Sequence, residues 1–226
     1  MTQPNPSARQ QIVAAAADMI RRRGPNATSI RDLAKHANAP LGSTYHYFPG
    51  GKQQLVTEAV RFAGDTVART LRAKLQAGPV EGLRAFLALW HDILTGTDFG
   101  AGCPVLAVSV EEPAGDEPPS ALTTAAEVFT AWESLLAGSL QRHGAARQQA
   151  EQLATLIVAA VEGAVAMCRA TRSTRPLDHV SAQLEALVGT ALGTRTAAET
   201  TGTGIGTRPA IQEGHAQGSG RSTPSP

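Results

Sequence analysis

The chain has 226 residues, of which 42% are hydrophobic and 17% are charged, and its net charge at pH 7 is +1. It is long enough to bury one substantial core or two small ones. Because no run of about 18 uninterrupted apolar residues occurs and the first ten residues lack a signal-peptide pattern, we expect a cytoplasmic protein without a membrane partner. The two cysteines, Cys103 and Cys168, match no metal-ligand spacing, so we expect neither a metal nor another cofactor.

Nearly all of the chain from Ala8 to Leu192 shows apolar residues at helical spacing, which predicts an all-α fold. Glycine and proline clusters separate the predicted helices. Besides two short helices between residues 29 and 48, the expected helices are 8–23, 52–77, 80–95, 104–112, 120–143, 145–172 and 176–192. The last 34 residues, 193–226, are rich in Gly, Thr and Ser and are expected to form a disordered tail.

The first short helix is predicted to start at Ser29, whose hydroxyl can cap the amide of Asp32, while Asp32 can reach back to the Ser29 backbone. Ile30, Leu33 and Ala34 then form one apolar stripe. The pattern stops at residues 37–38, where an asparagine can adopt the left-handed conformation of a sharp turn. These signals predict a short capped helix followed by a turn.

The second short helix is predicted to start at Pro40, because a proline suits the first helical position. Leu41, Tyr45 and Phe48 follow at i, i+4 and i+7 and are expected to pack on the neighbouring helix. A helix, a turn and a second helix form the unit whose second helix enters the DNA major groove.

The order IRDLAKHA, then GSTYHYF, then a glycine break and Lys52 at the start of a long helix, resembles the amino-terminal domain of TetR-type repressors. The short segments FPGGK and GCP further resemble the branch of the TetR family that includes lincomycin-resistance repressors. Two departures concern the pose of the second helix: Asn38 stands where glycine is usual, and Ala39-Pro40 replaces the usual valine-serine. The resemblance implies an amino-terminal arm (1–7), a helix-turn-helix domain (8–55), an effector-binding and dimerisation domain (56–192) and the tail (193–226).

The distribution of charge agrees with a DNA-binding amino-terminal part of the chain (residues 1–52), which we call the head. Residues 1–52 carry seven basic and two acidic side chains, a net charge of +5, and the remainder carries −4. The alternative for Arg21 to Arg23 is a solvated helix end favoured by the helix dipole. The predicted DNA-binding residues are Thr28, Ser29, Arg31, Leu41, Gly42, Ser43, Tyr45, His46, Tyr47 and Lys52. Tyr45 and Lys52 could instead only brace the junction with the next helix.

The segment 145–172 carries apolar residues on opposite sides, so both sides need to be covered, and the segment 176–192 adds another apolar stripe. In TetR-like proteins the last two long helices form a four-helix dimer interface, and these segments match that position. The resemblance therefore implies a homodimer on a palindromic operator; the alternative is a monomer core. The candidate interface residues are Val158, Val161, Val165, Leu184, Leu187 and Val188. Of these, Val158, Val161, Leu184 and Val188 are expected to lack a partner in their own subunit.

Aromatic side chains in the predicted effector-binding domain suggest a pocket for a small hydrophobic effector, although helical cores look similar. The candidate pocket residues are Phe86, Trp90, His91, Phe99, Phe129, Trp132, Glu162 and Met167. Glu162 lies in an apolar segment, where a buried carboxylate needs a partner or ligand; exposure or pairing with Arg169 would remove that need.

The expected function is that of a non-enzymatic, ligand-relieved transcriptional repressor. An alternative from another class is a thiol-based sensor or enzyme, in which Cys103 at a helix start would be the reactive group and His91 its base. A further alternative is a TetR-like scaffold that binds a ligand but not DNA.

Overall fold

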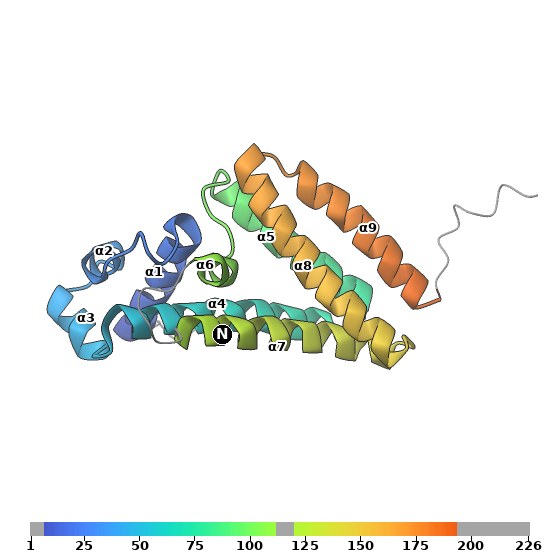
Figure 1. The fold of residues 1–226 in the computed structure, drawn as a ribbon, viewed down its shortest axis with the longest axis horizontal. Helices are drawn as coiled ribbons and strands as arrows, with labels where there is room; N and C mark the ends of the chain where they lie inside the picture. The colour runs from blue at the N-terminus through green and yellow to red at the C-terminus, as the bar shows by residue number, and fades with distance from the viewer. Residues whose placement is uncertain (1–6, 112–119, 194–226) are drawn as a thin grey trace, which may run out of the picture. The chain divides into compact units, whose positions relative to one another are not determined.

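The computed structural model describes residues 7–111 and 120–193, and its regular elements are α-helices, as predicted (Figure 1). The described part of the chain forms nine: α1 (Ala8–Arg23), α2 (Ile30–His36), α3 (Leu41–Tyr47), α4 (Gly51–Lys74), α5 (Pro79–Gly96), α6 (Pro104–Val110), α7 (Ser120–Arg142), α8 (Arg147–Thr171) and α9 (Arg175–Ala191). The predicted ends differ from these by three residues or fewer, because glycine and proline mark most of the breaks.

The helix α1 begins with a capping box, in which the Ser7 hydroxyl accepts from the Gln10 amide and the Gln10 side chain accepts from the Ser7 amide. It ends at Gly24, which has φ +78° and lies against the Glu111 side chain. Any larger residue there would be strained and would also collide with Glu111.

The helices α2 and α3 form the predicted helix-turn-helix. Ser29 caps α2 at the amide of Asp32, and Asn38 has the expected left-handed conformation with φ +50°. Pro40 is the cap that precedes α3 rather than its first residue. The predicted packing stripe of α3 is wrong at Tyr45, which is 55% exposed, because Thr44 and Phe48 form the buried side.

The helices α4 and α7 run side by side, and α8 and α9 pack against each other (Figure 1). The Trp132 indole on α7 donates to the Gly64 carbonyl of α4 at 3.0 Å. A side chain at Gly64 would collide with Val128, so the glycine permits this close approach. The helix α6 contacts α1, α4 and α7 and lies between the head and the remaining helices.

The described residues belong to one compact unit with a continuous core. The predicted boundary at 55/56 falls within α4 and stays a functional division that we propose. Most of the predicted arm and all but the first residue of the predicted tail lie outside the described residues, whereas Ser7 is the cap of α1.

The helix α8 is long and apolar enough by length and composition to cross a membrane, with half of the apolar window buried in the protein. Buried core helices pass the same test, and the buried side of α8 packs against α7 and α9.

Candidate functional site

The helix-turn-helix presents a shallow depression at the start of α2. Ser29, Tyr45 on α3 and Lys52 on α4 line this depression together. The Lys52 ammonium lies 3.5 Å from the Asn26 carbonyl, which places it beside the turn between α1 and α2. The Tyr45 phenol and the Lys52 ammonium can both donate hydrogen bonds to phosphate, whereas the Ser29 hydroxyl already donates to the Asp32 carboxylate, which also lines the depression.

The other predicted DNA-binding residues differ in exposure. Arg31, Gly42 and His46 are exposed, while Leu41 and Ser43 are partly exposed in the first turn of α3. This is the end of a recognition helix that meets base edges in helix-turn-helix proteins.

Two of the predicted DNA-binding side chains have structural roles. Thr28 is buried, and its hydroxyl donates to the Pro25 carbonyl at 2.8 Å, so its side chain stabilises the turn instead of facing DNA. Tyr47 is partly buried against the core and makes an edge contact with His46. The ring of Tyr47 therefore contributes to holding α3 in place.

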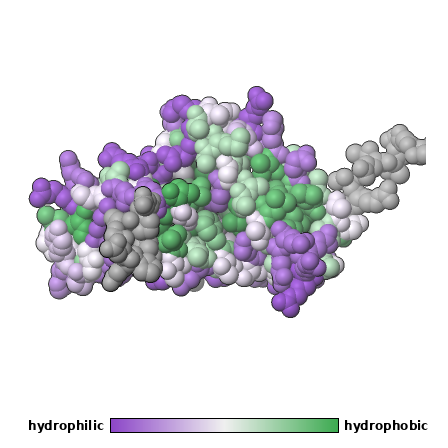
Figure 2. All heavy atoms as spheres, in the orientation of Figure 1, coloured by the Kyte–Doolittle hydropathy of each residue, from purple (hydrophilic) through white to green (hydrophobic). Residues whose placement is uncertain are grey.

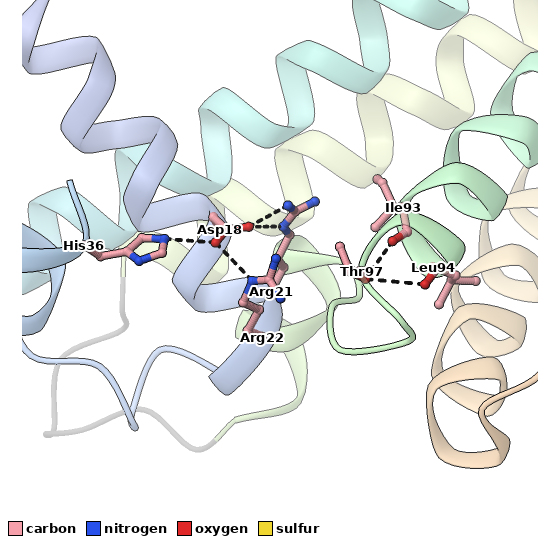
Figure 3. Close-up of polar contacts among 7 residues, drawn as sticks. All are labelled: Asp18, Arg21, Arg22, His36, Ile93, Leu94 and Thr97. Atoms are coloured by element: carbon pink, nitrogen blue, oxygen red, sulfur yellow. Dashed lines mark hydrogen bonds and ion pairs between the residues drawn. The ribbon is translucent and has the colours of Figure 1, made fainter. Parts of the chain in front are cut away.

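An ion-pair network on α1 was not predicted. Asp18 accepts from the guanidiniums of Arg21 and Arg22 and from the His36 imidazole of α2 at 2.9 Å (Figure 3). Partial burial by itself raises the pKa of Asp18, but hydrogen bonds from these three side chains lower it to about 2. The spacing Asp18–Arg21–Arg22 on one helix is a sequence signal for this network, whereas His36 joins it only through the fold.

Three hydrogen bonds attach the end of α1 and the following turn to the rest of the protein. The Gly102 amide donates to the Arg21 carbonyl at 2.9 Å, and Arg169 of α8 donates to the Arg22 carbonyl at 3.1 Å. Beyond α6, Glu111 accepts from the Asn26 amide at 2.8 Å. The two flanks of α6 therefore hold the base of the helix-turn-helix.

The predicted pocket aromatics form a packed cluster. Phe86 makes edge contacts with Trp90 and Trp132, and Phe129 makes one with Trp132. Phe86, Trp90 and Trp132 are fully buried, so most of this group is core. Phe99 is partly buried against the core.

Two predicted pocket residues lie on the surface, which contradicts their assignment to an internal pocket. His91 is exposed on α5, and Met167 is 57% exposed on α8. Each falls on the outward side of its helix, a direction that apolar spacing alone did not reveal.

A cavity of about 240 Å³ lies among α1, α4, α5 and the start of α6. Of the predicted pocket residues only Trp90 lines it, together with residues that were not predicted, including Ala17, Phe62, Ala63 and Ile93. The Trp90 Nε1 atom is buried and has no hydrogen-bond acceptor among the described residues.

Glu162 on α8 is 4% exposed, and within the described ranges neither carboxyl oxygen has a hydrogen bond of standard geometry. Burial raises the pKa of Glu162 to about 8, and the neighbouring Cys103 thiol offsets part of this rise. Exposure and pairing with Arg169 are both wrong as explanations, because Glu162 is buried and Arg169 donates to α1.

The alternative based on a reactive Cys103 is not supported. The thiol is buried, and burial, followed by the nearby Glu162, raises its pKa well above the usual range. His91, the suggested base, is exposed. A thiol that stays protonated is a poor nucleophile.

Four of the six candidate dimer residues, Val158, Val161, Leu184 and Val188, are expected to lack partners in their own subunit, and this expectation is wrong. Val158, Val161, Val165, Leu184 and Val188 are buried within one protomer, and only Leu187 is exposed. They face the inside because α8 and α9 bury their apolar sides against each other and against α5 and α7. The outward side of α8 instead carries Leu156 and Met167.

Comparisons with known proteins agree with this architecture. Residues 12–59 match the family described as bacterial regulatory proteins, tetR family, and residues 79–183 match the C-terminal domain of LmrA/YxaF-like transcriptional regulators. An uncharacterized HTH-type transcriptional regulator of Mycobacterium tuberculosis is 42% identical over 185 residues, which are 80% of this chain and 93% of the relative.

More distant relatives include the regulators YxaF and LmrA of Bacillus subtilis. They are 31% and 30% identical over 80% and 76% of this chain, and over 94% and 92% of their own lengths. A crystal structure of a TetR transcriptional regulator from Legionella pneumophila aligns with a TM-score of 0.70 at 22% identity, covering 81% of this chain and 98% of the other. The chain therefore belongs to the TetR family of bacterial transcriptional regulators and carries an LmrA/YxaF-like C-terminal domain.

Proposed function

We propose that this regulator is a cytoplasmic, ligand-relieved repressor that binds a palindromic operator as a homodimer. The observation that carries the proposal is the joint placement of Tyr45 and Lys52 around one depression beside the open first turn of α3. Phosphate contacts from this depression would orient the head, while Leu41, Gly42 and Ser43 would meet base edges. The intact basic head argues against a scaffold that binds only a ligand.

The outward side of α8 supports a dimer. Its exposed positions between Gln152 and Arg169 carry no charged residue, and Leu156 and Met167 are 46% and 57% exposed. Leu187 on the neighbouring α9 adds a third exposed apolar side chain, and Figure 2 shows apolar groups gathered over these two helices. A surface of this kind is typical of protein interfaces.

Relief by a ligand would use the attachments of α1. Both flanks of α6 and the Asp18 network hold the helix-turn-helix to the rest of the protein. A ligand that prefers a conformation with these contacts altered would lower operator affinity by its difference in affinity for the two states.

Selection of bound sequences from a random DNA pool tests the proposal. We expect a consensus with two-fold symmetry and half-sites about 34 to 36 Å apart, or a multiple of that distance. Ser43→Ala should alter the preferred bases within each half-site. A selected pool without sequence preference would overturn the DNA-reading role, and a consensus without symmetry would overturn the dimeric mode.

A further inference from the structure

The cavity beside Trp90 is shared between the DNA-binding head and the body. Ala17 of α1 forms one wall, Phe62 and Ala63 of α4 form another, and Trp90 and Ile93 of α5 form a third. A molecule in this cavity would therefore touch the first helix of the head directly. At about 30 Å³ for each water-sized group, 240 Å³ has room for roughly eight non-hydrogen atoms, and because the cavity is partly open to solvent, a slightly longer ligand can extend through the opening.

The polar end of the cavity is lined by one anion, Asp18, and one cation, Arg21. Asp18 is also bonded to Arg22 and His36, which lie outside the lining (Figure 3). One carboxylate thus faces two guanidiniums and an imidazole. Arg21 uses Nε and Nη2 for Asp18, and no described residue accepts from its Nη1.

The hydrogen-bonding groups of the cavity also favour a ligand with acceptor atoms. Trp90 has a buried Nε1–H without an acceptor in the described part of the chain, and Arg21 retains donor capacity. The one carboxylate in the lining, Asp18, already accepts from three side chains. A cationic ligand would find no free acceptor of opposite charge there, whereas a carboxylate would meet Arg21.

We propose that this junction cavity binds a small anionic amphiphile, with the apolar part between α1, α4 and α5 and the carboxylate on Arg21. The inference rests on the proposed ligand-relieved repressor and specifies the class of its effector. Because Arg21 also holds Asp18, a ligand carboxylate competes with that contact. Its apolar part meanwhile lies against α1, the helix that Asp18 connects to His36 of α2. Binding thereby acts on α1, which holds α2 through the Asp18–His36 bond and the rest of the protein through the Gly102–Arg21 bond.

Titration of the full-length, DNA-free protein with octanoate, octanol and octylammonium below their micellar concentrations tests the site. Calorimetry should show octanoate binding at least tenfold more tightly than octanol, the factor expected for one charge-assisted hydrogen bond. Octylammonium should bind more weakly than both. Equal affinities for the three probes would overturn the proposal.

Three variants test the location. Arg21→Gln should reduce octanoate affinity to that of octanol, and Ala63→Leu should fill the cavity and weaken both probes. Arg22→Gln is the matched control, because Arg22 also bonds Asp18 but does not line the cavity. It should retain the octanoate preference, and circular dichroism should show that all three variants are folded. An Arg21→Gln protein that still prefers octanoate would refute the assignment.

Operator binding without any ligand is measured separately on the selected DNA. Its absence would overturn the proposed function and leave the titration result standing. Octanoate binding with the expected preference, combined with at least tenfold weaker operator binding, would support both.

Discussion

Replacing Glu162 by glutamine should remove a pH dependence from the stability of the protein. The folded-state pKa of Glu162 is raised from 4.5 to about 8 by burial. The folded protein therefore holds this proton more tightly than the unfolded chain does. Below about pH 4.5 the carboxyl is protonated in both states and does not lower the free energy of unfolding. As the pH rises from there to about 8, Glu162 destabilises the folded protein increasingly.

The size of this effect follows from the interval. Each pH unit within it lowers the free energy of unfolding by about 1.4 kcal/mol, so the wild-type protein should lose about 3 kcal/mol from Glu162 between pH 5.5 and 7.5. Glutamine has nearly the same shape and does not titrate. Contributions from the histidines are common to both proteins and cancel in the comparison.

Urea unfolding followed by tryptophan fluorescence, at one fixed protein concentration, measures the difference. Relative to the wild type, Glu162→Gln should gain about 3 kcal/mol in stability from pH 5.5 to pH 7.5. Glu127→Gln, at a carboxylate whose side chain is 63% exposed, controls for the loss of one negative charge. Identical pH dependence in the wild type and Glu162→Gln would show that Glu162 is not buried as a neutral acid.

Three other substitutions test separate parts of the structure. Leu156→Glu places a charge on the proposed dimer surface and should shift the protein to monomers in light scattering, whereas Leu122→Glu, at another exposed leucine, should not. Lys52→Ala should weaken binding to all DNA sequences and reduce the slope of log affinity against log salt concentration by about 1. Lys74→Ala, at the far end of α4, should leave this slope unchanged. A lower melting temperature with an unaltered slope would mean that Lys52 only braces the turn. Asp18 has a lowered pKa, so the stability that it contributes is present above about pH 3.8 and is lost toward pH 2. Asp18→Asn should lower the free energy of unfolding by about 1 kcal/mol at pH 7, after allowance for solvent screening, and should not change it near pH 2. An equal loss at both pH values would contradict the network.

The sequence alone determined the helices, the helix-turn-helix and the family. Caps such as Ser29, the turn at Asn38 and the glycine and proline breaks act within a few residues of each other, so their effects can be read along the chain. The burial of Glu162 was also open to prediction, since the surrounding segment is apolar on several sides.

Only the tertiary structure decided which side of each helix faces inward and which distant groups meet. Val161 and Leu187 have similar chemistry, yet one is buried within the protomer and the other is exposed, because neighbouring helices cover only some apolar sides. His36 meets Asp18 across the contact between α1 and α2, and Trp90 shares a cavity with Ala17, which is distant from it in the sequence. Helical periodicity specifies a direction relative to the helix axis, while the partner in that direction depends on how the helices pack.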